Sequence, residues 1–224
     1  MDAPFLGFPD TQAFLRDLRA NNDRDWFNAH KKIYERAFKA PGEAFAAELR
    51  PRLEALAGVK LGAKVFRIHR DVRFSKDKSP YNTHLHIGFQ HQRAGAEPRR
   101  RGGFYFGIDP DAVTLGVGAF DFGPADLDRY RKAVADDHEG GELAKIMASL
   151  GARQHDADLK RVPAPYPADH ARAEFLKRKG LNAWRDLDGA PVDSPDLADA
   201  VMAEFEALDA INVWLTEVLE GWTP

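Results

Sequence analysis

The pattern of apolar and polar positions divides the chain into three parts with different periods. Apolar residues recur at mainly helical spacing over residues 10–57, alternate with polar residues over 64–120, and return to helical spacing after residue 123. This order predicts an α+β fold, in which an antiparallel sheet of about four or more strands (residues 64–120) is packed by N-terminal and C-terminal helices. We expect a single domain over residues 1–224.

The N-terminal part is expected to hold three helices. Asp10 or Thr11 is suited to cap the first of them. Pro41 and Gly42 are expected to break the apolar run that follows. Pro51 lies within the third helix, so it should bend that helix or mark a new start.

Two segments of the central part alternate in opposite phase. In VFRIHRDVRF (65–74) the even positions are apolar, with Arg70 as the exception, whereas in NTHLHIGF (82–89) the apolar positions are odd. Directly opposed residues of an antiparallel pair share a face, so paired residue numbers should sum to an odd value. One face should then collect the polar residues of both strands, namely Arg67, His69, Asp71, Arg73, His84 and His86. A bulge at Arg70 would turn that side chain toward the same face.

The remaining segments complete the sheet and the C-terminal helices. A second hairpin is predicted from FYFGI (104–108) and VTLGVGAF (113–120), joined by a turn. A helix is expected from about Ala168 to Lys179, and another begins at Ser194-Pro195. The last helix carries one apolar stripe, which favours core packing over a dimer seam: Leu197, Val201, Phe205, Leu208, Ile211, Leu215 and Leu219.

Composition excludes several classes of protein. The chain has no cysteine, so disulfides, thiolate zinc sites and cysteine nucleophiles are excluded. Its net charge of −3 argues against a nucleic-acid coat protein. The N-terminus does not have the pattern of a signal peptide, and no apolar run is long enough for a membrane span, so we expect a cytoplasmic protein without a membrane partner. The sequence indicates no cofactor and does not determine an oligomeric state.

The expected polar face favours recognition of a small phosphorylated or carboxylated ligand. Arginine offers a fixed fork of donors to such anions, and histidine and aspartate can transfer protons. Asp71 and His84 are therefore the candidate acid–base residues, if the site is catalytic. The candidate ligand-binding residues come from both hairpins and the loop in the first: Arg67, Arg70, Arg73, Ser75, Lys76, Lys78, Tyr81 and Tyr105.

Three other interpretations remain open at the level of sequence. A basic loop containing Arg93 and Arg99–Arg101 is suited to a nucleic-acid or protein-binding module. His84 and His86, with a carboxylate such as Asp71, are suited to a metal-dependent hydrolase. Alternatively, the motif has a structural role, in which its aspartates neutralise its arginines.

The central segment also resembles a known family. The pattern F-R-x-x-R-D-x-R-F-S-x-D-K-S-P-Y-x-T-H, here residues 66–84, resembles the core motif of the uncharacterised bacterial domain-of-unknown-function family 2461. NNDRDWF (21–27) is similar to that family's N-terminal signature, and the second hairpin also resembles its counterpart in the family. Position 82, often lysine in the family, is Asn82 here. The resemblance covers roughly residues 5–220 and implies no particular activity.

Overall fold

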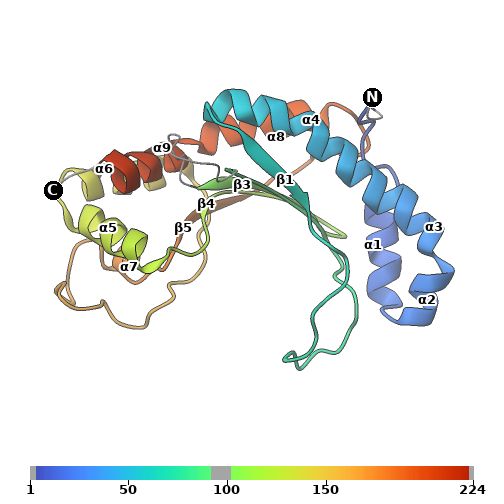
Figure 1. The fold of residues 1–224 in the computed structure, drawn as a ribbon, viewed down its shortest axis with the longest axis horizontal. Helices are drawn as coiled ribbons and strands as arrows, with labels where there is room; N and C mark the ends of the chain where they lie inside the picture. Colours follow the sequence, from blue (N-terminus) through green and yellow to red (C-terminus); the bar gives the residue numbers. More distant parts are fainter. Residues whose placement is uncertain (1–3, 92–101, 222–224) are drawn as a thin grey trace. The chain divides into compact units, whose positions relative to one another are not determined.

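The structure is a computed structural model that describes residues 4–91 and 102–221. Within these ranges, five strands form one antiparallel sheet in the order β1-β2-β3-β4-β5 (Figure 1). The strands are β1 (Leu61–Val65), β2 (Leu85–His91), β3 (Gly103–Ile108), β4 (Val113–Ala119) and β5 (Leu181–Asp186). The helices are α1 (Thr11–Ala20), α2 (Arg24–Ala29), α3 (Lys31–Tyr34), α4 (Ala40–Ala57), α5 (Pro124–Ala135), α6 (Glu139–Leu150), α7 (Ala173–Leu176), α8 (Leu197–Leu208) and α9 (Ala210–Thr216), with π-helical turns η1 (Glu35–Lys39) and η2 (Glu217–Gly221). The predicted α+β class is confirmed.

The chain divides into two compact units, each with its own packed interior. Among the described residues, the first unit comprises 4–89, 105–115 and 186–204, and the second comprises 90–91, 102–104, 116–185 and 205–221.

The first unit packs α4 against the sheet through aromatic side chains. The ring of Phe45 lies 4.5 Å from that of Phe106 on β3, and the Phe8 ring lies 5.3 Å from that of Phe45. All three side chains are fully buried, and so are Leu85 and Ile87 on β2. The residues between Leu85, Ile87 and Phe89, namely His86 and Gly88, are only half-buried because successive side chains of a strand point to opposite faces.

Pro41 and Pro51 do not interrupt the N-terminal helices. Pro41 and Gly42 do not break the helical run, which continues from η1 into α4, and the carbonyl of Ala37, four residues before Pro41, accepts a hydrogen bond from the Thr11 hydroxyl instead. Pro51 lies inside α4, which continues as one helix to Ala57.

The second unit contains an element that the sequence analysis missed. Strand β5 follows Gly180, and Trp184 within it packs over β4, where a Cβ on Gly116 would lie 2.6 Å from the indole. The predicted helix from Ala168 to Lys179 is reduced to the four residues of α7. Trp214 is buried, and its indole N–H donates a 3.0 Å hydrogen bond to the Glu139 carbonyl.

The apolar stripe near the C-terminus belongs to the core. Its seven residues lie on α8, α9 and η2, and each is at most 2 % exposed. The core-packing interpretation of the stripe is therefore confirmed. Among the described residues, no helix has the length and apolar character required to span a bilayer.

Candidate functional site

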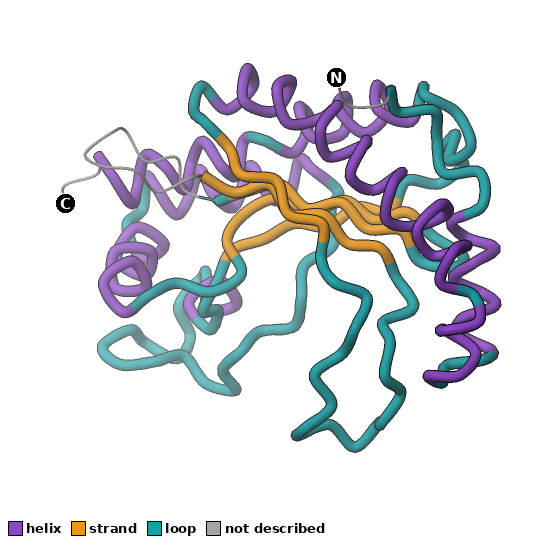
Figure 2. The backbone as a smooth tube through the Cα atoms, turned by 45° about the vertical axis from the view of Figure 1, so that its right-hand side comes forward, coloured by secondary structure: helices purple, strands orange, loops and turns teal. Residues whose placement is uncertain are grey.

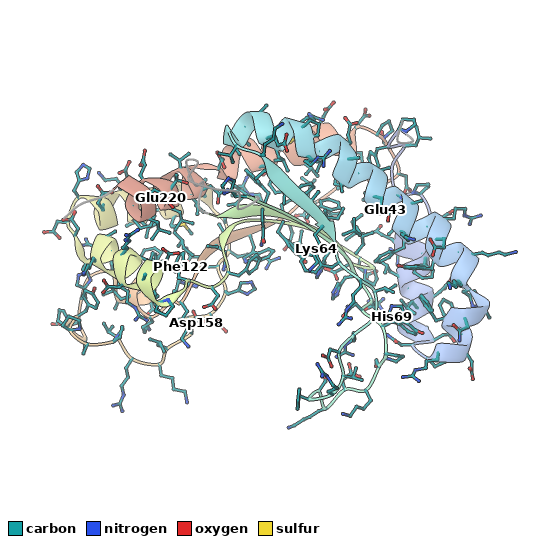
Figure 3. All side chains as sticks on the ribbon, in the orientation of Figure 1. Glu43, Lys64, His69, Phe122, Asp158 and Glu220 are labelled. Carbon is teal, nitrogen blue, oxygen red and sulfur yellow. The ribbon has the colours of Figure 1, made fainter. Side chains whose placement is uncertain are left out.

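The central motif forms a long loop instead of a regular hairpin. Strand β1 ends at Val65 and β2 begins at Leu85, and the segment between them leaves the sheet (Figure 2). Only the base of this loop is paired, through an antiparallel bridge between His69 and Tyr81. Figure 3 labels His69 where the chain leaves the sheet.

The observed register corrects the expected polar face. His69 opposes Tyr81, so the paired residue numbers sum to an even value, and the prediction of an odd sum is wrong. Strand alternation does not continue through the loop, because its backbone is bent and bonded locally beyond Arg70. Arg67, Asp71 and Arg73 are exposed residues of the loop, so the proposed convergence of arginines on one strand face does not follow from this register.

Charged residues of the loop are bonded mainly to one another. Arg70 donates from Nη1 to a carboxylate oxygen of Asp77 at 2.5 Å and to the Ser79 carbonyl at 3.2 Å. Asp77 also accepts from the backbone N–H and the hydroxyl of Ser79, at 2.9 and 2.6 Å. These Ser79 hydrogen bonds, followed by the one from Arg70, hold the pKa of Asp77 far below its ordinary value.

The outer part of the loop shows the same local bonding. The guanidinium of Arg73 donates to the Asp71 carboxylate, with the shortest contact at 2.6 Å, and Lys78 donates to the Val72 carbonyl at 3.0 Å. The Phe74 side chain is 95 % exposed. Much of the charge in this motif therefore shapes the loop itself.

The N-terminal signature anchors the base of the loop. The Asn22 side chain donates to the Tyr81 carbonyl at 2.9 Å and accepts from the Tyr81 N–H at 3.1 Å. Asp23, the next residue, caps α2 by accepting from the Trp26 N–H at 2.8 Å. The Phe27 ring stacks on the buried Tyr81 ring at 4.1 Å. The two sequence motifs therefore form one structural unit.

A polar cleft of about 420 Å³ lies at this junction. It brings together the end of α1, the loop base and the start of β2 through Arg19, Asn22, Arg70, Asp77, Ser79, Tyr81, Asn82, Thr83 and His84. Both hydrogen bonds of Arg70 use Nη1, so its Nε and Nη2 have no hydrogen-bond partner among the described residues. The Thr83 hydroxyl likewise has no partner within residues 4–91 and 102–221.

The cleft contains three of the residues selected from the sequence, Arg70, Tyr81 and His84. The other predicted ligand-binding residues and the predicted catalytic Asp71 do not line it: Arg67, Asp71, Arg73, Ser75, Lys76, Lys78 and Tyr105. Lys78 lines a separate hollow beside Asn22 and Pro80. Arg93 and Arg99–Arg101 lie outside the described residues.

A second group of polar side chains adjoins the cleft at His84. The His84 and His86 rings stack with centroids 3.6 Å apart, and the edge of His86 meets the Tyr105 ring at 4.9 Å. The possible metal-ligating atoms of His84, His86 and Asp109 all lie within 4.8 Å of one another. We call these three residues the histidine cluster. A Cβ on the buried Gly107 would lie 3.2 Å from the His86 ring, so only glycine leaves the imidazole its present space.

Partial burial determines the electrostatics of the histidine cluster. It lowers the pKa of His86 to about 3, with a further contribution from His84, and it also lowers the pKa of His84, against the opposing effect of Asp109. Burial raises the pKa of Asp109, and the charge of His84 opposes that shift. Both imidazoles are consequently neutral at pH 7 and retain a lone pair for a ligand.

Sequence reasoning missed Arg19, Asn22 and Asp109. Asp109 had a detectable signal, because it begins the turn predicted after residues 104–108 and shares odd parity with Tyr105 and Gly107. The position of Arg19 depends on how α1 packs, since Arg16 and Arg19 both pair with Asp111 in that turn, at 3.2 and 3.0 Å. The sequence alone contains no signal for that packing.

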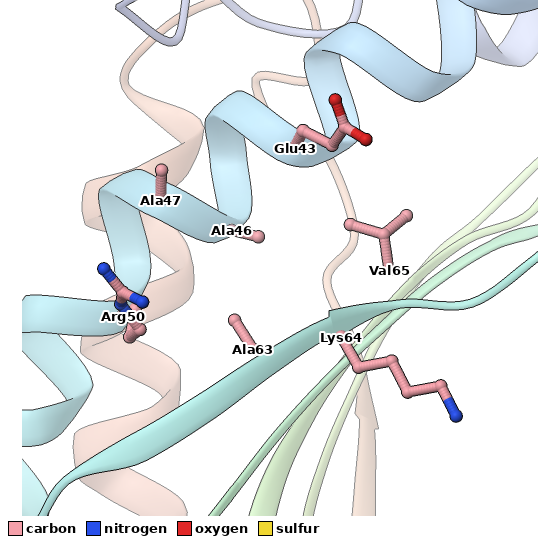
Figure 4. Close-up of a pocket in the computed structure, with 7 residues that line it drawn as sticks. All are labelled: Glu43, Ala46, Ala47, Arg50, Ala63, Lys64 and Val65. Atoms are coloured by element: carbon pink, nitrogen blue, oxygen red, sulfur yellow. The ribbon is translucent and has the colours of Figure 1, made fainter. Parts of the chain in front are cut away.

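Another hollow of about 470 Å³ lies between α4 and the edge strand β1 (Figure 4). Ala46 and Val65 point into it from facing elements, while Lys64 extends away from the helix. Its walls combine short aliphatic side chains with Glu43, Arg50 and Lys64.

An α+β domain with a polar cleft beside its sheet is the class that these features define. Residues 10–214 match the family described as "Conserved hypothetical protein (DUF2461)", and the chain belongs to that family. No curated protein matches the chain.

Proposed function

We propose that the protein binds a small phosphorylated or carboxylated molecule in the cleft beside Arg70. The observation that carries this proposal is the incomplete use of Arg70. One of its nitrogens fixes the loop through Asp77 and Ser79, and the remaining N–H groups have no partner among the described residues of the chain. An arginine held in place by one edge can present its other edge to an oxyanion.

The other walls of the cleft suit the same class of ligand. Arg19 supplies a second guanidinium, whereas the single carboxylate of the lining, Asp77, already accepts bonds from Arg70 and Ser79. Thr83 adds a hydroxyl and His84 a neutral imidazole. A volume of about 420 Å³ corresponds to a small molecule. His84 remains the acid–base candidate of the cleft, and Asp71, which does not line it, has no place in the proposed site.

A thermal-shift and calorimetric screen tests the proposal. The ligands are inorganic phosphate, nucleotides, sugar phosphates and dicarboxylates, and the variants are Arg70→Gln, Thr83→Val and the control Arg73→Gln. Arg73 belongs to the same motif but does not line the cleft. We expect at least one anion to stabilise the wild type, with about tenfold weaker binding to Arg70→Gln and unchanged binding to Arg73→Gln.

Arg70→Gln could weaken binding simply by disturbing the loop. Thr83→Val removes a cleft hydroxyl without altering the Arg70–Asp77 pair, so weaker binding to this variant does not have that cause. Weakened binding in both cleft variants supports the proposal, provided that their melting temperatures without ligand stay near that of the wild type. The absence of any stabilising anion, or equal binding to Arg70→Gln and the wild type, would overturn it.

A further inference from the structure

We propose that His84, His86 and Asp109 form a binding site for a divalent transition-metal ion such as Zn²⁺. The site is distinct from the anion cleft and shares one residue with it, His84. Two imidazoles and one carboxylate form a donor set that such ions commonly use, and three protein ligands leave a coordination position open.

The backbone places the three donors on one face of the sheet. His84 directly precedes β2, His86 lies within it, and Asp109 directly follows β3, the neighbouring strand. Their ligand atoms are at most 4.8 Å apart. Bonds of about 2.0–2.1 Å in tetrahedral geometry place ligand atoms about 3.3 Å apart, so side-chain rotation would complete the site without moving either strand.

The three donors also lack protein partners. Neither imidazole, and neither oxygen of the Asp109 carboxylate, makes a hydrogen bond or ion pair with any residue that the structure describes. The three side chains are half-buried, so their donor atoms remain open to solvent and to an ion that enters from it. A metal ion would satisfy all three at once, and the neutral imidazoles offer the lone pairs that it needs.

The stacked arrangement of the two rings predicts how metal binding would appear. A metal ion lies close to the plane of each imidazole that it binds, and the two planes are now nearly parallel, at 11°. At least one ring must therefore rotate out of the stack. Binding would change the imidazole signals of both histidines in an NMR spectrum, and it would leave those of exposed histidines unchanged.

The chain supplies a matched control for this site. His138, Glu139 and Glu142 also bring possible ligand atoms within 4.8 Å of one another, but they lie in the first turn of α6 with the His138 side chain 84 % exposed. His138 already contacts Glu139 at 3.5 Å. This group has the same donor types without the burial and the unpaired state of the histidine cluster.

Titration calorimetry with Zn²⁺ on chelator-treated, phosphate-free protein tests the inference. We expect one ion per chain, at least tenfold weaker binding to Asp109→Asn and to His86→Ala, and wild-type binding to His138→Gln. Asp109→Asn keeps the shape of the side chain, so its thermal melt should show a folded protein. The imidazole spectrum of the wild type should change on addition of one equivalent of Zn²⁺.

No uptake of Zn²⁺, or uptake that Asp109→Asn and His86→Ala leave unchanged, would overturn the inference. Loss of uptake in His138→Gln alone would also overturn it, because the ion would then occupy the surface group. Neither outcome bears on the anion cleft, since the titration contains no phosphate or carboxylate ligand and alters no residue that holds Arg70.

Discussion

The loop at residues 66–84 and the histidine cluster at its end differ in how their polar groups are used. In the loop, the Asp77 carboxylate accepts hydrogen bonds from Arg70 and from Ser79, so its hydrogen-bonding capacity maintains the loop. In the cluster, the side chains of His86 and Asp109 make no hydrogen bond to any described residue. The density of charge in a motif therefore does not locate its chemistry. The polar groups without a partner among the described residues are the better guide, and they include Arg70 and Thr83 of the loop as well as His86 and Asp109.

The largest expected effect comes from releasing the loop at its base. Asn22→Ala removes two hydrogen bonds to the backbone of Tyr81, so it should lower the free energy of unfolding by about 2 kcal/mol. Urea unfolding measures the change. Asn21→Ala is the matched control, because its side chain is exposed and bonds only to the Asp17 carbonyl, at 2.9 Å. Equal losses in the two variants would show that Asn22 does not anchor the loop.

The next largest effect is a loss of folding stability at acidic pH that arises from the histidine cluster. The pKa of His86 is about 3 in the folded protein against an ordinary 6.5, so between these values the unfolded chain takes up a proton that the folded chain does not. Stability should consequently fall as the pH falls through this window. From pH 6.5 to about 4.5 we expect this histidine to cost about 1–2 kcal/mol, after allowance for solvent on its open side.

His86→Phe should remove that part of the acid sensitivity. Urea unfolding in chelator-containing buffer at both pH values measures it, with His138→Gln as the control for a histidine on the surface. If wild type and His86→Phe lose stability in parallel on acidification, the imidazole is not held neutral by burial.

The smallest effect distinguishes the two ion pairs of the loop, Arg70–Asp77 and Arg73–Asp71. Asp71 and Arg73 are exposed, so Asp71→Asn should leave the unfolding midpoint unchanged. Asp77→Asn should instead accelerate amide exchange at Ser79, because its carboxylate accepts both that N–H and the Arg70 guanidinium. Hydrogen exchange followed by NMR compares the two variants. Faster exchange of the Ser79 amide in Asp71→Asn alone would show that Asp71, and not Asp77, holds this part of the loop.

Local periodicity was sufficient for much of the fold. The alternation of Leu85, Ile87 and Phe89 identified β2 and its buried face, and the turn at 109–112 joined β3 to β4 as expected. Strand β5 was missed because residues 181–184 are all buried, so the segment does not show the alternation of a half-exposed strand. Pro41 was misjudged because the hydrogen bond that its missing N–H cannot make is replaced from a distant segment, where the Thr11 hydroxyl donates to the Ala37 carbonyl.

The candidate site was less predictable than the fold. Of the residues selected from the family motif, Arg70, Tyr81 and His84 line the cleft, and their role there stays a prediction. The expected face failed because alternation was extended through residues 66–74, where the chain had already left the sheet. Apolar residues such as Phe74 gave the appearance of a strand although that side chain is exposed. Arg19 enters through a contact between distant segments, its ion pair with Asp111, which a local pattern does not contain.

Gly107 limits the space available to the side chains of the histidine cluster. A methyl group there would come within 3.2 Å of the His86 ring and 3.3 Å of the Tyr105 ring, so at least one of these side chains would have to shift slightly. A Gly107→Ala substitution would therefore retain every donor atom of the cluster while crowding one imidazole. The position separates the steric requirements of the cluster from its chemical ones.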